Sequence, residues 1–446
     1  MIVIKTIGGY NEVGKNMTAI KCGNDVVIFD MGLHLENYIR VTEDEQGDIK
    51  NITVSRLLKA GAIPDVRKLG DWKSKVKAII PTHAHLDHVG AIHFLARKFD
   101  APIICTPFTK AVIKTILKDE KIRLDNEIKS INVNSMYKLT DEMCVEFINM
   151  THSTPQTVMV ALHTPEGVVV YANDFKFDSH PMLGKKPNYA RLKKLAEEKV
   201  IALIVDCIYA KDAKKTPSEK VAESMLQDVL TGVESEGKAI IVTTFSSHLA
   251  RLKSIIKFGK RLRRKIIFLG RSLAKYVNSA ESINLINFKK DVELIKYSKK
   301  IKAKLDQVAK HKDRYLLVVT GHQGEPKAVL SKMIDRFYNF KFGKDDIVIF
   351  SCTVIPNKLN IKNRKSLEEK LRSKGVRIFR DIHVSGHAAK EDLRDLINML
   401  RPANIIPAHG VMKMSLALAE LAQEVGYSKQ NIFVSRDGKQ IVLSKT

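Results

Sequence analysis

The densest group of residues that could do chemistry lies in the segment IIPTHAHLDHVG, residues 79–90, which contains His83, His85, Asp87 and His88 in a His-x-His-x-Asp-His pattern. Three imidazoles and a carboxylate so close together cannot all be buried without partners, because unpaired polar groups are costly in an apolar interior. A divalent metal is the natural partner, since imidazole and carboxylate suit zinc, or manganese where more oxygen enters. This spacing predicts a metal site and strongly disfavours a polar loop with scattered histidines.

The residues on either side of this segment indicate how it is held. Residues 77–81 (KAIIP) form a short apolar run that is typical of a buried strand, and Pro81 ends it. The ligand-type residues are therefore expected on a loop at the carboxyl end of a strand, where open α/β folds place their chemistry. Residues 90–99 (GAIHFLARKF) then predict an amphipathic helix.

The same order, an apolar strand and then a ligand-type residue, recurs along the chain. It is seen at Asp30, His152, Asp174, Asp206 and His409, which end or follow the expected strands 25–30, 144–150, 167–172, 200–206 and 403–407. Each residue has an ordinary explanation as a turn residue or helix cap. Together they predict that several strand ends converge on one site, where Asp30 could orient a metal-bound histidine.

The composition favours a nucleic-acid partner. The 446 residues include 75 Lys and Arg against 49 Asp and Glu, a formal net charge of +26, and such a surface attracts polyanions. Basic residues concentrate in 251–265 and 289–314. The alternative is a lysine-rich surface that serves solubility or heat stability.

Other features of the sequence narrow the location. No run of about 18 apolar residues is present, so no membrane-spanning helix is expected. The first residues enter a strand directly and lack the pattern of a signal peptide. Five widely spaced cysteines, without a Cys-x-x-Cys pair, predict a reducing, cytoplasmic location.

The order of the segments predicts an interrupted domain. From about Pro217 the chain becomes basic while strands and helices still alternate, as in a second α/β region. Ligand-type residues then return at His383, His387 and His409. We therefore expect a first domain at 1–206 that is completed by 373–446, with a domain of residues 207–372 inserted between them.

Several motifs match a known family. The histidine segment with GGYNEVGKNM (8–17), TGHQGEP (320–326), HVSGHA (383–388) and PAHG (407–410) resembles the ribonuclease J family, in the β-CASP branch of the metallo-β-lactamase superfamily. The resemblance covers nearly the whole chain. It implies an α/β fold, namely a metallo-β-lactamase αββα sandwich with an inserted α/β β-CASP domain.

The resemblance also implies the site. Two divalent metal ions, zinc before manganese or magnesium, would be held by His83, His85 and His152 on one side and by Asp87, His88 and His409 on the other. Asp174 would bridge the two ions and Asp30 would stand behind them. Asp87, Asp174, Asp206 and His387 would be catalytic, with a protonated His387, oriented by Asp206, giving a proton to the leaving oxygen. A 5′-monophosphate would be bound by Ser246, Ser247, His383, Ser385 and His387.

The implied activity is metal-dependent 5′-to-3′ exoribonuclease action on single-stranded RNA with 5′-monophosphate ends, in RNA decay and processing. The sequence departs from bacterial members at 206–210 (DCIYA), where they carry a Glu-Ser-Thr-Asn-like stretch, and at Val411, where an acidic residue is usual. It is also expected to lack their extra C-terminal domain, like the archaeal members, which leaves a homodimer open.

Three other functions are alternatives to this one. An endoribonuclease of the cleavage and polyadenylation factor type would, in archaea, carry N-terminal KH domains, which are not expected here. A small-molecule metallohydrolase would have no need of the basic insertion. A non-catalytic RNA-binding protein is disfavoured because every expected metal ligand is present.

Overall fold

The structure is a computed structural model that describes residues 1–43 and 53–443. The chain forms two compact units, which are treated separately below. The first unit comprises residues 1–179, 184–216 and 386–446, and the second comprises 180–183 and 217–385. Within the described residues, no helix has both the length and the apolar character that a membrane crossing requires.

The first unit contains two sheets. The 7-stranded sheet has the order β19 (Lys439–Leu443), β1 (Ile2–Gly8), β2 (Met17–Cys22), β3 (Asp25–Phe29), β4 (Val76–Ile80), β5 (Ile103–Cys105) and β6 (Ile128–Ser130). The 6-stranded sheet has the order β18 (Ile405–Ala408), β11 (Val200–Asp206), β10 (Gly167–Ala172), β9 (Val158–Thr164), β8 (Cys144–Asn149) and β7 (Ser135–Lys138). Their inner faces share one core, in which the rings of Phe29 and Tyr171 stack with centroids 5.0 Å apart.

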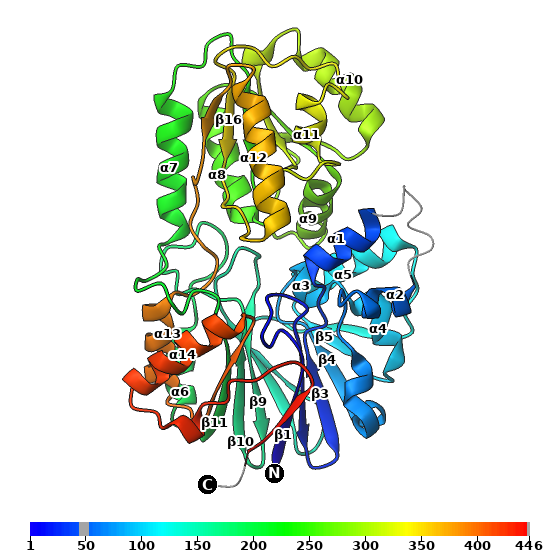
Figure 1. The fold of residues 1–446 in the computed structure, drawn as a ribbon, viewed down its shortest axis with the longest axis vertical. Helices are drawn as coiled ribbons and strands as arrows, with labels where there is room; N and C mark the ends of the chain where they lie inside the picture. Colours follow the sequence, from blue (N-terminus) through cyan, green and yellow to red (C-terminus); the bar gives the residue numbers. More distant parts are fainter. Residues whose placement is uncertain (44–52, 444–446) are drawn as a thin grey trace. The chain divides into compact units, whose positions relative to one another are not determined.

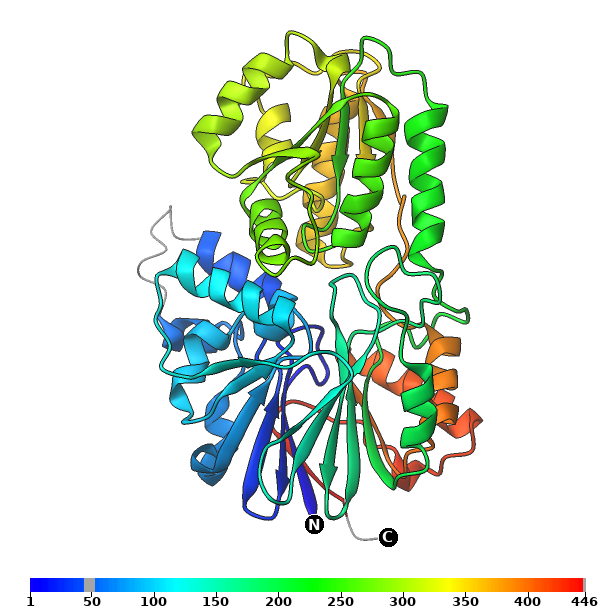
Figure 2. The same cartoon turned by 180° about the vertical axis from the view of Figure 1, so that it is seen from behind.

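Helices cover the outer faces of both sheets (Figures 1 and 2). One layer holds α1 (Leu35–Glu43), α2 (Val54–Lys59), the 3-10 segments η2 (Val66–Lys75) and η3 (Ala96–Lys98), α3 (Leu86–Val89), α4 (Ile92–Leu95) and α5 (Pro107–Glu120). The other holds α6 (Tyr189–Leu195), α13 (Lys390–Leu400) and α14 (Met412–Glu424), whose leucines pack on the outer face of the second sheet. The predicted αββα sandwich is confirmed.

The C-terminal segment completes both sheets of the first unit. β18 pairs in parallel with β11, with Leu203 opposite Ile405, and β19 pairs antiparallel with β1, with Ile4 opposite Ile441. Both pairings bury apolar side chains, since Ile4, Leu203 and Ile405 are all at 0% exposure. The first unit therefore closes only after the chain returns from the second.

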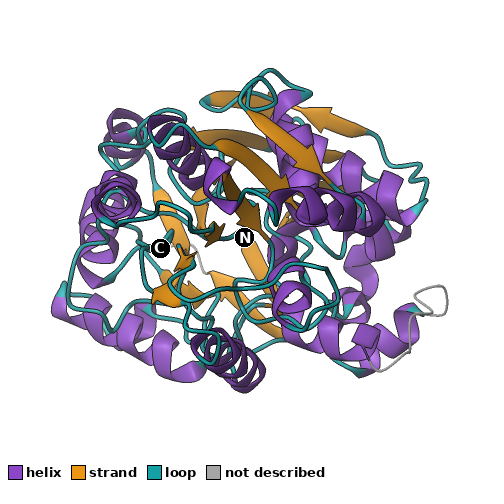
Figure 3. Cartoon of the chain, turned by 90° about the horizontal axis from the view of Figure 1, so that it is seen from above, coloured by secondary structure: helices purple, strands orange, loops and turns teal. Residues whose placement is uncertain are grey.

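The second unit contains a 6-stranded, all-parallel sheet. Its order is β14 (Val292–Ile295), β13 (Lys265–Leu269), β15 (Tyr315–Val319), β12 (Ile240–Thr243), β16 (Ile347–Phe350) and β17 (Arg377–Phe379). The connecting helices are α7 (Glu219–Gly232), α8 (Leu249–Arg261), α9 (Arg271–Glu281), α10 (Ser298–Val308), α11 (Val329–Ile334) and α12 (Lys358–Arg372), with the 3-10 turn η4 (Lys312–Arg314). Parallel sheets need cover on both faces, which agrees with the nearly continuous apolar strands; Figure 3 distinguishes these strands and helices by colour.

The unit boundaries lie later in the chain than the sequence suggested. They fall after Thr216 and after Ser385, whereas the expected domain boundaries followed residues 206 and 372. The segment before Thr216 stays with the first unit because the Thr216 amide donates to Asp392 Oδ2 at 2.7 Å and its hydroxyl donates to the His387 carbonyl at 2.7 Å. β17 stays with the second unit because it pairs with β16.

Candidate metal centre

The site begins where β4 ends. Pro81 follows the last residue of this strand, Thr82 and His83 come next, and the chain then turns into α3, which carries Asp87 and His88 in its single turn. Because Asp87 and His88 lie in α3, part of the ligand segment is helical and not the loop that was expected. The helix expected at 90–99 is split between α4 and η3. Gly32 permits this arrangement, because a Cβ there would lie 1.6 Å from the Asp87 carbonyl oxygen.

Four donor groups converge in the first cluster, formed by His83, His85, His152 and Asp174. His85 Nδ1 lies 3.1 Å from both His83 Nε2 and His152 Nε2. Asp174 Oδ2 lies 3.4 Å from His83 Nε2 and 3.5 Å from His152 Nε2. Ligand atoms that surround a tetrahedral zinc at 2.0–2.1 Å are about 3.3 Å apart, so these four atoms fit around one ion.

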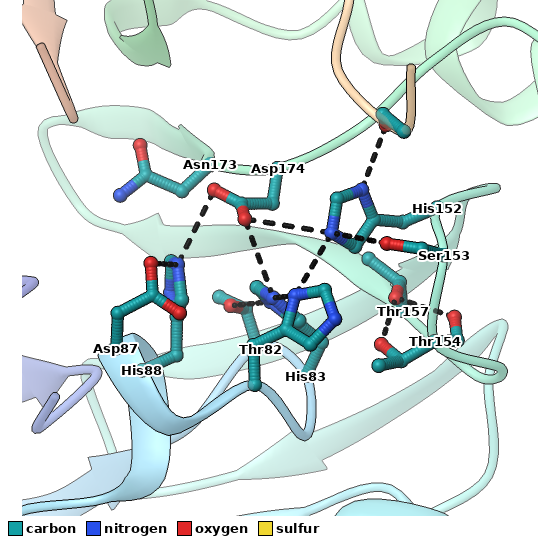
Figure 4. Close-up of polar contacts among 12 residues, drawn as sticks. Thr82, His83, Asp87, His88, His152, Ser153, Thr154, Thr157, Asn173 and Asp174 are labelled. Atoms are coloured by element: carbon teal, nitrogen blue, oxygen red, sulfur yellow. Dashed lines mark hydrogen bonds and ion pairs between the residues drawn. The ribbon is translucent and has the colours of Figure 1, made fainter. Parts of the chain in front are cut away.

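A second cluster shares Asp174 and is formed by Asp87, His88, Asp174 and His409. Asp174 Oδ1 lies 3.2 Å from His88 Nε2 and 3.4 Å from His409 Nε2, and Asp87 Oδ2 lies 3.7 Å from each of these nitrogens. Figure 4 shows the Asp174 carboxylate between the His88 side and the His83–His152 side. One carboxylate thus offers a different oxygen to each cluster, as a bridging ligand would.

The donor sets fit divalent cations better than any arrangement without them. Asp174 Oδ1 is buried and accepts no hydrogen bond from the described residues, although an unpaired buried carboxylate oxygen is costly. Burial, together with the neighbouring imidazoles, holds the pKa values of His83, His85 and His152 well below their usual range. These rings are therefore neutral, which is the form that ligates metal.

The charge balance differs in the second cluster. Burial lowers the pKa of His88, but the carboxylates of Asp174, Asp30 and Asp87 outweigh burial and raise it well above its usual range. Burial raises the pKa of Asp174, but His88, His409 and His387 lower it far more. The carboxylates of this cluster therefore favour a positive charge next to them. A protonated His88 would supply it, and so would a metal ion bound to neutral His88.

Neighbouring groups fix the outward-facing nitrogens of the ligand-type histidines. Asp30 Oδ2 lies 2.7 Å from His88 Nδ1, so Asp30 sits behind His88 as the sequence predicted, and its Oδ1 accepts from the Thr82 amide at 2.8 Å. The Gly386 carbonyl accepts from His152 Nδ1 at 2.7 Å. Such contacts set the tautomer that leaves Nε2 facing the metal position.

Asn16 plays the same part for His409, and the sequence did not single it out. Its Oδ1 lies 2.9 Å from His409 Nδ1, and its Nδ2 donates to the Asp87 carbonyl at 3.1 Å. Gly9, with a positive φ of 87°, makes room, because a Cβ there would lie 2.4 Å from Asn16 Oδ1. Asn16 belongs to the glycine-rich stretch 8–17, whose local pattern is equally typical of a hairpin loop, so only the family motif pointed to it.

Three residues of the site have strained backbones. Asp30, Asp174 and His409 have φ values of 58°, 50° and 53°, in the left-handed region that side chains with a Cβ seldom adopt. Each residue stands just past the end of its strand, where the left-handed turn aims the side chain at the clusters. Backbone strain of this kind persists where the surrounding structure enforces it, and it is concentrated in functional sites.

Asp206 and His387 form a pair beside the clusters. His387 Nδ1 lies 2.7 Å from Asp206 Oδ2, and its Nε2 lies 4.0 Å from Asp174 Oδ2. The other Asp206 oxygen accepts from the Ile208 amide at 2.8 Å. Burial lowers the pKa of His387, but Asp174 and Asp206 outweigh it and raise the pKa to about 9. The imidazole is therefore positioned to carry a proton.

The residues expected to bind a 5′-phosphate divide between the units. Ser246, Ser247 and His383 belong to the second unit, Ser385 is its last residue, and His387 belongs to the first. The two serines are buried just past β12, and Ser246 Oγ lies 2.9 Å from Ser272 Oγ. Arg251 Nη1 lies 3.5 Å from His383 Nδ1, so this ring nitrogen accepts.

Comparisons with known proteins agree with this geometry. Residues 11–209 match the metallo-beta-lactamase superfamily, residues 237–366 match the family "Ribonuclease J, beta-CASP domain", and residues 376–435 match the "Zn-dependent metallo-hydrolase RNA specificity domain". The first match contains most of the ligand-type residues and the third contains His383, His387 and His409.

Full-length relatives are similar as well. The chain is 44% identical over 443 residues to a ribonuclease J of Pyrococcus abyssi (98% of this chain, 96% of the relative). It is 40% identical over 439 residues to one of Methanocaldococcus jannaschii (98% of this chain, 97% of the relative). A solved structure, a protein of unknown function from Enterococcus faecalis, has a TM-score of 0.67 at 17% identity and covers 99% of this chain and 100% of its own, which supports the fold alone.

Proposed function

The chain belongs to the ribonuclease J family, and we propose that it degrades single-stranded RNA from the 5′ end and prefers 5′-monophosphate ends, in RNA decay and processing. Its family makes it a metal-dependent ribonuclease. The observation that carries the proposal is the pair of donor clusters that share Asp174, in a chain that matches ribonuclease J along nearly its whole length.

We propose that two divalent ions bind, one in each cluster. His83, His85 and His152 would hold one ion, Asp87, His88 and His409 the other, and Asp174 both. Zinc is favoured over manganese and magnesium because imidazole nitrogens outnumber carboxylate oxygens in the donor sets. Bound ions of this kind lower the pKa of water and withdraw charge from a phosphodiester.

The side chains around the clusters supply the remaining steps. Asp206 accepts from His387 Nδ1 and fixes the ring, which leaves Nε2 as the proton donor. A proton held at Nε2 can pass to the 3′ oxygen that leaves when the phosphodiester breaks. Asp30, Asn16 and the Gly386 carbonyl keep the ligand histidines aimed inward, so that the site needs little reorganisation before reaction.

The preference for a 5′-monophosphate is assigned to Ser246, Ser247, His383 and Ser385, with His387 as the predicted partner from the first unit. Small hydroxyl groups and backbone amides suit a compact anion. A bulky substitution, Ser385→Leu, is expected to reduce the preference for 5′-monophosphate over 5′-triphosphate RNA, measured as the ratio of the two kcat/KM values. An unchanged ratio would remove Ser385 from the pocket.

We also propose a cytoplasmic location, which is supported by the five cysteines, all of them unpaired. A homodimer stays a prediction.

The direct test uses single-stranded RNA with a labelled 5′-monophosphate and added manganese, magnesium or zinc. Release of a labelled mononucleotide from the start of the reaction is the expected result. Labelled 5′ fragments of several nucleotides would instead indicate an endoribonuclease like the cleavage and polyadenylation factor subunit. No cleavage with any metal would contradict the proposal and reopen the small-molecule alternative.

A further inference from the structure

Two aromatic side chains of the second unit stand out in solvent. Tyr297 is 58% exposed and Phe337 is 59% exposed, and they are the only aromatic residues among the exposed large hydrophobic side chains of the described residues. Exposing a ring of this size forgoes a large apolar contribution to stability. The other aromatic residues that the structure describes are wholly or partly buried. The two exposed rings therefore need a functional explanation.

The two rings share one area of surface. Tyr297 lies between β14 and α10, and Phe337 follows α11. The residues beside them are in contact, since Ser298 Oγ lies 3.0 Å from Tyr338 Oη, and the rings of Phe337 and Tyr338 are 5.1 Å apart. Tyr297 precedes Ser298 in the chain and Phe337 precedes Tyr338, and neighbouring Cα atoms are about 3.8 Å apart. Tyr297 and Phe337 therefore flank the contact between Ser298 and Tyr338.

Lysines surround both rings. Lys296 Nζ lies 5.7 Å from the Tyr297 ring centroid, and Lys332 Nζ lies 5.1 Å from that of Phe337. Lys299 and Lys300 are exposed in the first turn of α10, which contains no acidic residue. Cations in a first turn oppose the helix dipole, so these lysines disfavour the helix that carries them. The group Tyr297, Phe337, Lys296, Lys299, Lys300 and Lys332 is called the aromatic–lysine patch below.

The patch lies at the functional edge of the parallel sheet. Ile295, which ends β14, is in register with Leu269, Leu269 with Val319, and Val319 with Thr243, which ends β12. The carboxyl ends of these strands are therefore level, and ligands of open α/β sheets bind at such ends. Three strand spacings separate β14 from β12, about 14 Å, so Tyr297 and the Ser246–Ser247 segment lie along the same edge.

We infer that the aromatic–lysine patch binds single-stranded RNA, with bases stacked on Tyr297 and Phe337 and phosphates next to the lysines. Exposed rings among cations form the usual platform for single-stranded nucleic acid, because every base has a face that can stack. The patch would hold nucleotides of the strand other than the 5′ nucleotide, whose phosphate is assigned to the Ser246–Ser247 segment of the same unit. This inference rests on the proposed function, since it takes RNA as the substrate.

The charge of the patch favours RNA over a second copy of the chain. In a symmetric dimer the same surface meets itself, which would bring the lysines of two copies together, and like charges that meet at an interface are unfavourable. A polyanion meets no such repulsion and also releases counterions when it binds.

The test measures the Kd for a 20-nucleotide single-stranded RNA in the Asp87→Ala background, which prevents cleavage. The double variant Tyr297→Ala/Phe337→Ala is expected to bind at least about 25-fold more weakly, since base stacking on one ring contributes about 5- to 160-fold. Ile361→Ala, which removes another exposed apolar side chain of the same unit, is the matched control and should leave Kd unchanged. When the aromatic double variant is made with Asp87 in place, its cleavage of a 5′-phosphorylated dinucleotide should equal that of the wild type. A dinucleotide is too short to span the edge of the parallel sheet.

The lysines are tested through salt. Lys299→Ser/Lys300→Ser is expected to reduce the slope of log Kd against log salt by about 1.4, since each phosphate contact on a single strand contributes about 0.7. Lys257→Ser/Lys260→Ser removes the same charge from lysines that pair with Glu223 and Asp291, and should leave the slope unchanged.

Three results would overturn the inference while leaving the proposed function intact, provided that the wild-type protein cleaves RNA. They are an unchanged Kd in the aromatic variant, an equal slope change in both lysine pairs, and a wild-type dimer that becomes monomeric in the aromatic variant at unchanged RNA affinity. A wild-type protein that neither binds nor cleaves RNA would refute the proposed function itself. Thermal unfolding of each variant, expected at the wild-type temperature, excludes misfolding as the cause of weaker binding.

Discussion

Each unit buries a cluster of charged and polar side chains, and the two clusters differ in whether they are complete. In the first unit, imidazole nitrogens face one another at 3.1 Å and Asp174 Oδ1 accepts no hydrogen bond from the described residues. In the second, Arg251 is fully buried and donates to both Glu219 carboxylate oxygens, to the Ser351 hydroxyl and to the Ile382 carbonyl. The first cluster needs a cation, whereas the second has all its partners. An incomplete buried cluster therefore marks a ligand site, and a complete one marks a structural core.

The largest effect is expected from removing a ligand of the first cluster. Asp174→Ala should abolish RNA cleavage and lower the bound metal measured by mass spectrometry, because both clusters lose their shared carboxylate. RNA binding should persist, since the lysines are untouched. Chelation of the wild-type metal should have the same effect on cleavage, and divalent ions should restore it. Full activity in a metal-free preparation would contradict the assignment.

The next effect concerns stability. Arg251→Met is expected to lower the free energy of unfolding of the second unit by about 3–5 kcal/mol, because the buried Glu219 carboxylate loses its guanidinium partner. Denaturant unfolding measures this loss. The double variant Arg251→Met/Glu219→Leu should recover part of it, since no buried charge then remains. Equal losses in the single and double variants would show that the ion pair itself is not the cause.

The same pair predicts a pH dependence. Burial raises the pKa of Glu219, but His248 and Arg251 outweigh it and hold the pKa well below its usual range. A depressed folded-state pKa contributes stability above about pH 4.5, and this contribution is lost as the pH falls through the folded value. The gap in unfolding free energy between wild type and Arg251→Met should therefore be constant near neutral pH and shrink in strong acid. A gap that is independent of pH would contradict this origin.

A smaller effect is expected behind the metal ligands. Asn16→Ala should weaken metal binding by about 10–100-fold, because such outer contacts orient the ligands and His409 Nδ1 loses its acceptor. Isothermal titration of the metal-free protein gives this value without reference to activity. Val13→Ala, in the same loop but 39% exposed, is the control. Equal metal affinities in the two variants would remove Asn16 from this role.

The smallest effect is expected at the surface of the second unit. Lys257→Ala removes a pair at 2.8 Å between the exposed Lys257 and the largely buried Glu223 and should lower the free energy of unfolding by no more than about 1 kcal/mol. Denaturant unfolding of Lys257→Ala and of Arg251→Met compares two substitutions in the same helix, α8. If Lys257→Ala lowered the free energy of unfolding as much as Arg251→Met does, the burial of Arg251 would not explain the effect of its removal.

The basic stretches show where the sequence was not sufficient. Charge counts in 251–265 and 289–314 predicted phosphate contacts equally for both. In the first stretch, Arg251 pairs with Glu219, Lys257 with Glu223 and Lys260 with Asp291, and Arg264 donates to the Ser235 carbonyl at 2.6 Å. Much of that charge is paired inside the unit, even where the lysine itself is exposed, whereas Lys299 and Lys300 of the second stretch form no ion pair among the described residues. A composition cannot distinguish a charge that is paired within the fold from one that is not.

The residue pattern of the sequence predicted the interrupted first unit and the residues that follow its strand ends, whereas the αββα sandwich was implied by the resemblance to a family. The residue pattern could do so because strands and turns are encoded by local patterns, and because a strand-then-ligand order repeats wherever parallel strands deliver side chains to one edge. Only the tertiary structure decided which Asp174 oxygen faces which cluster, that Asn16 stands behind His409, and that Tyr297 and Phe337 share one surface. These facts depend on contacts between residues far apart in the chain, which no local pattern specifies.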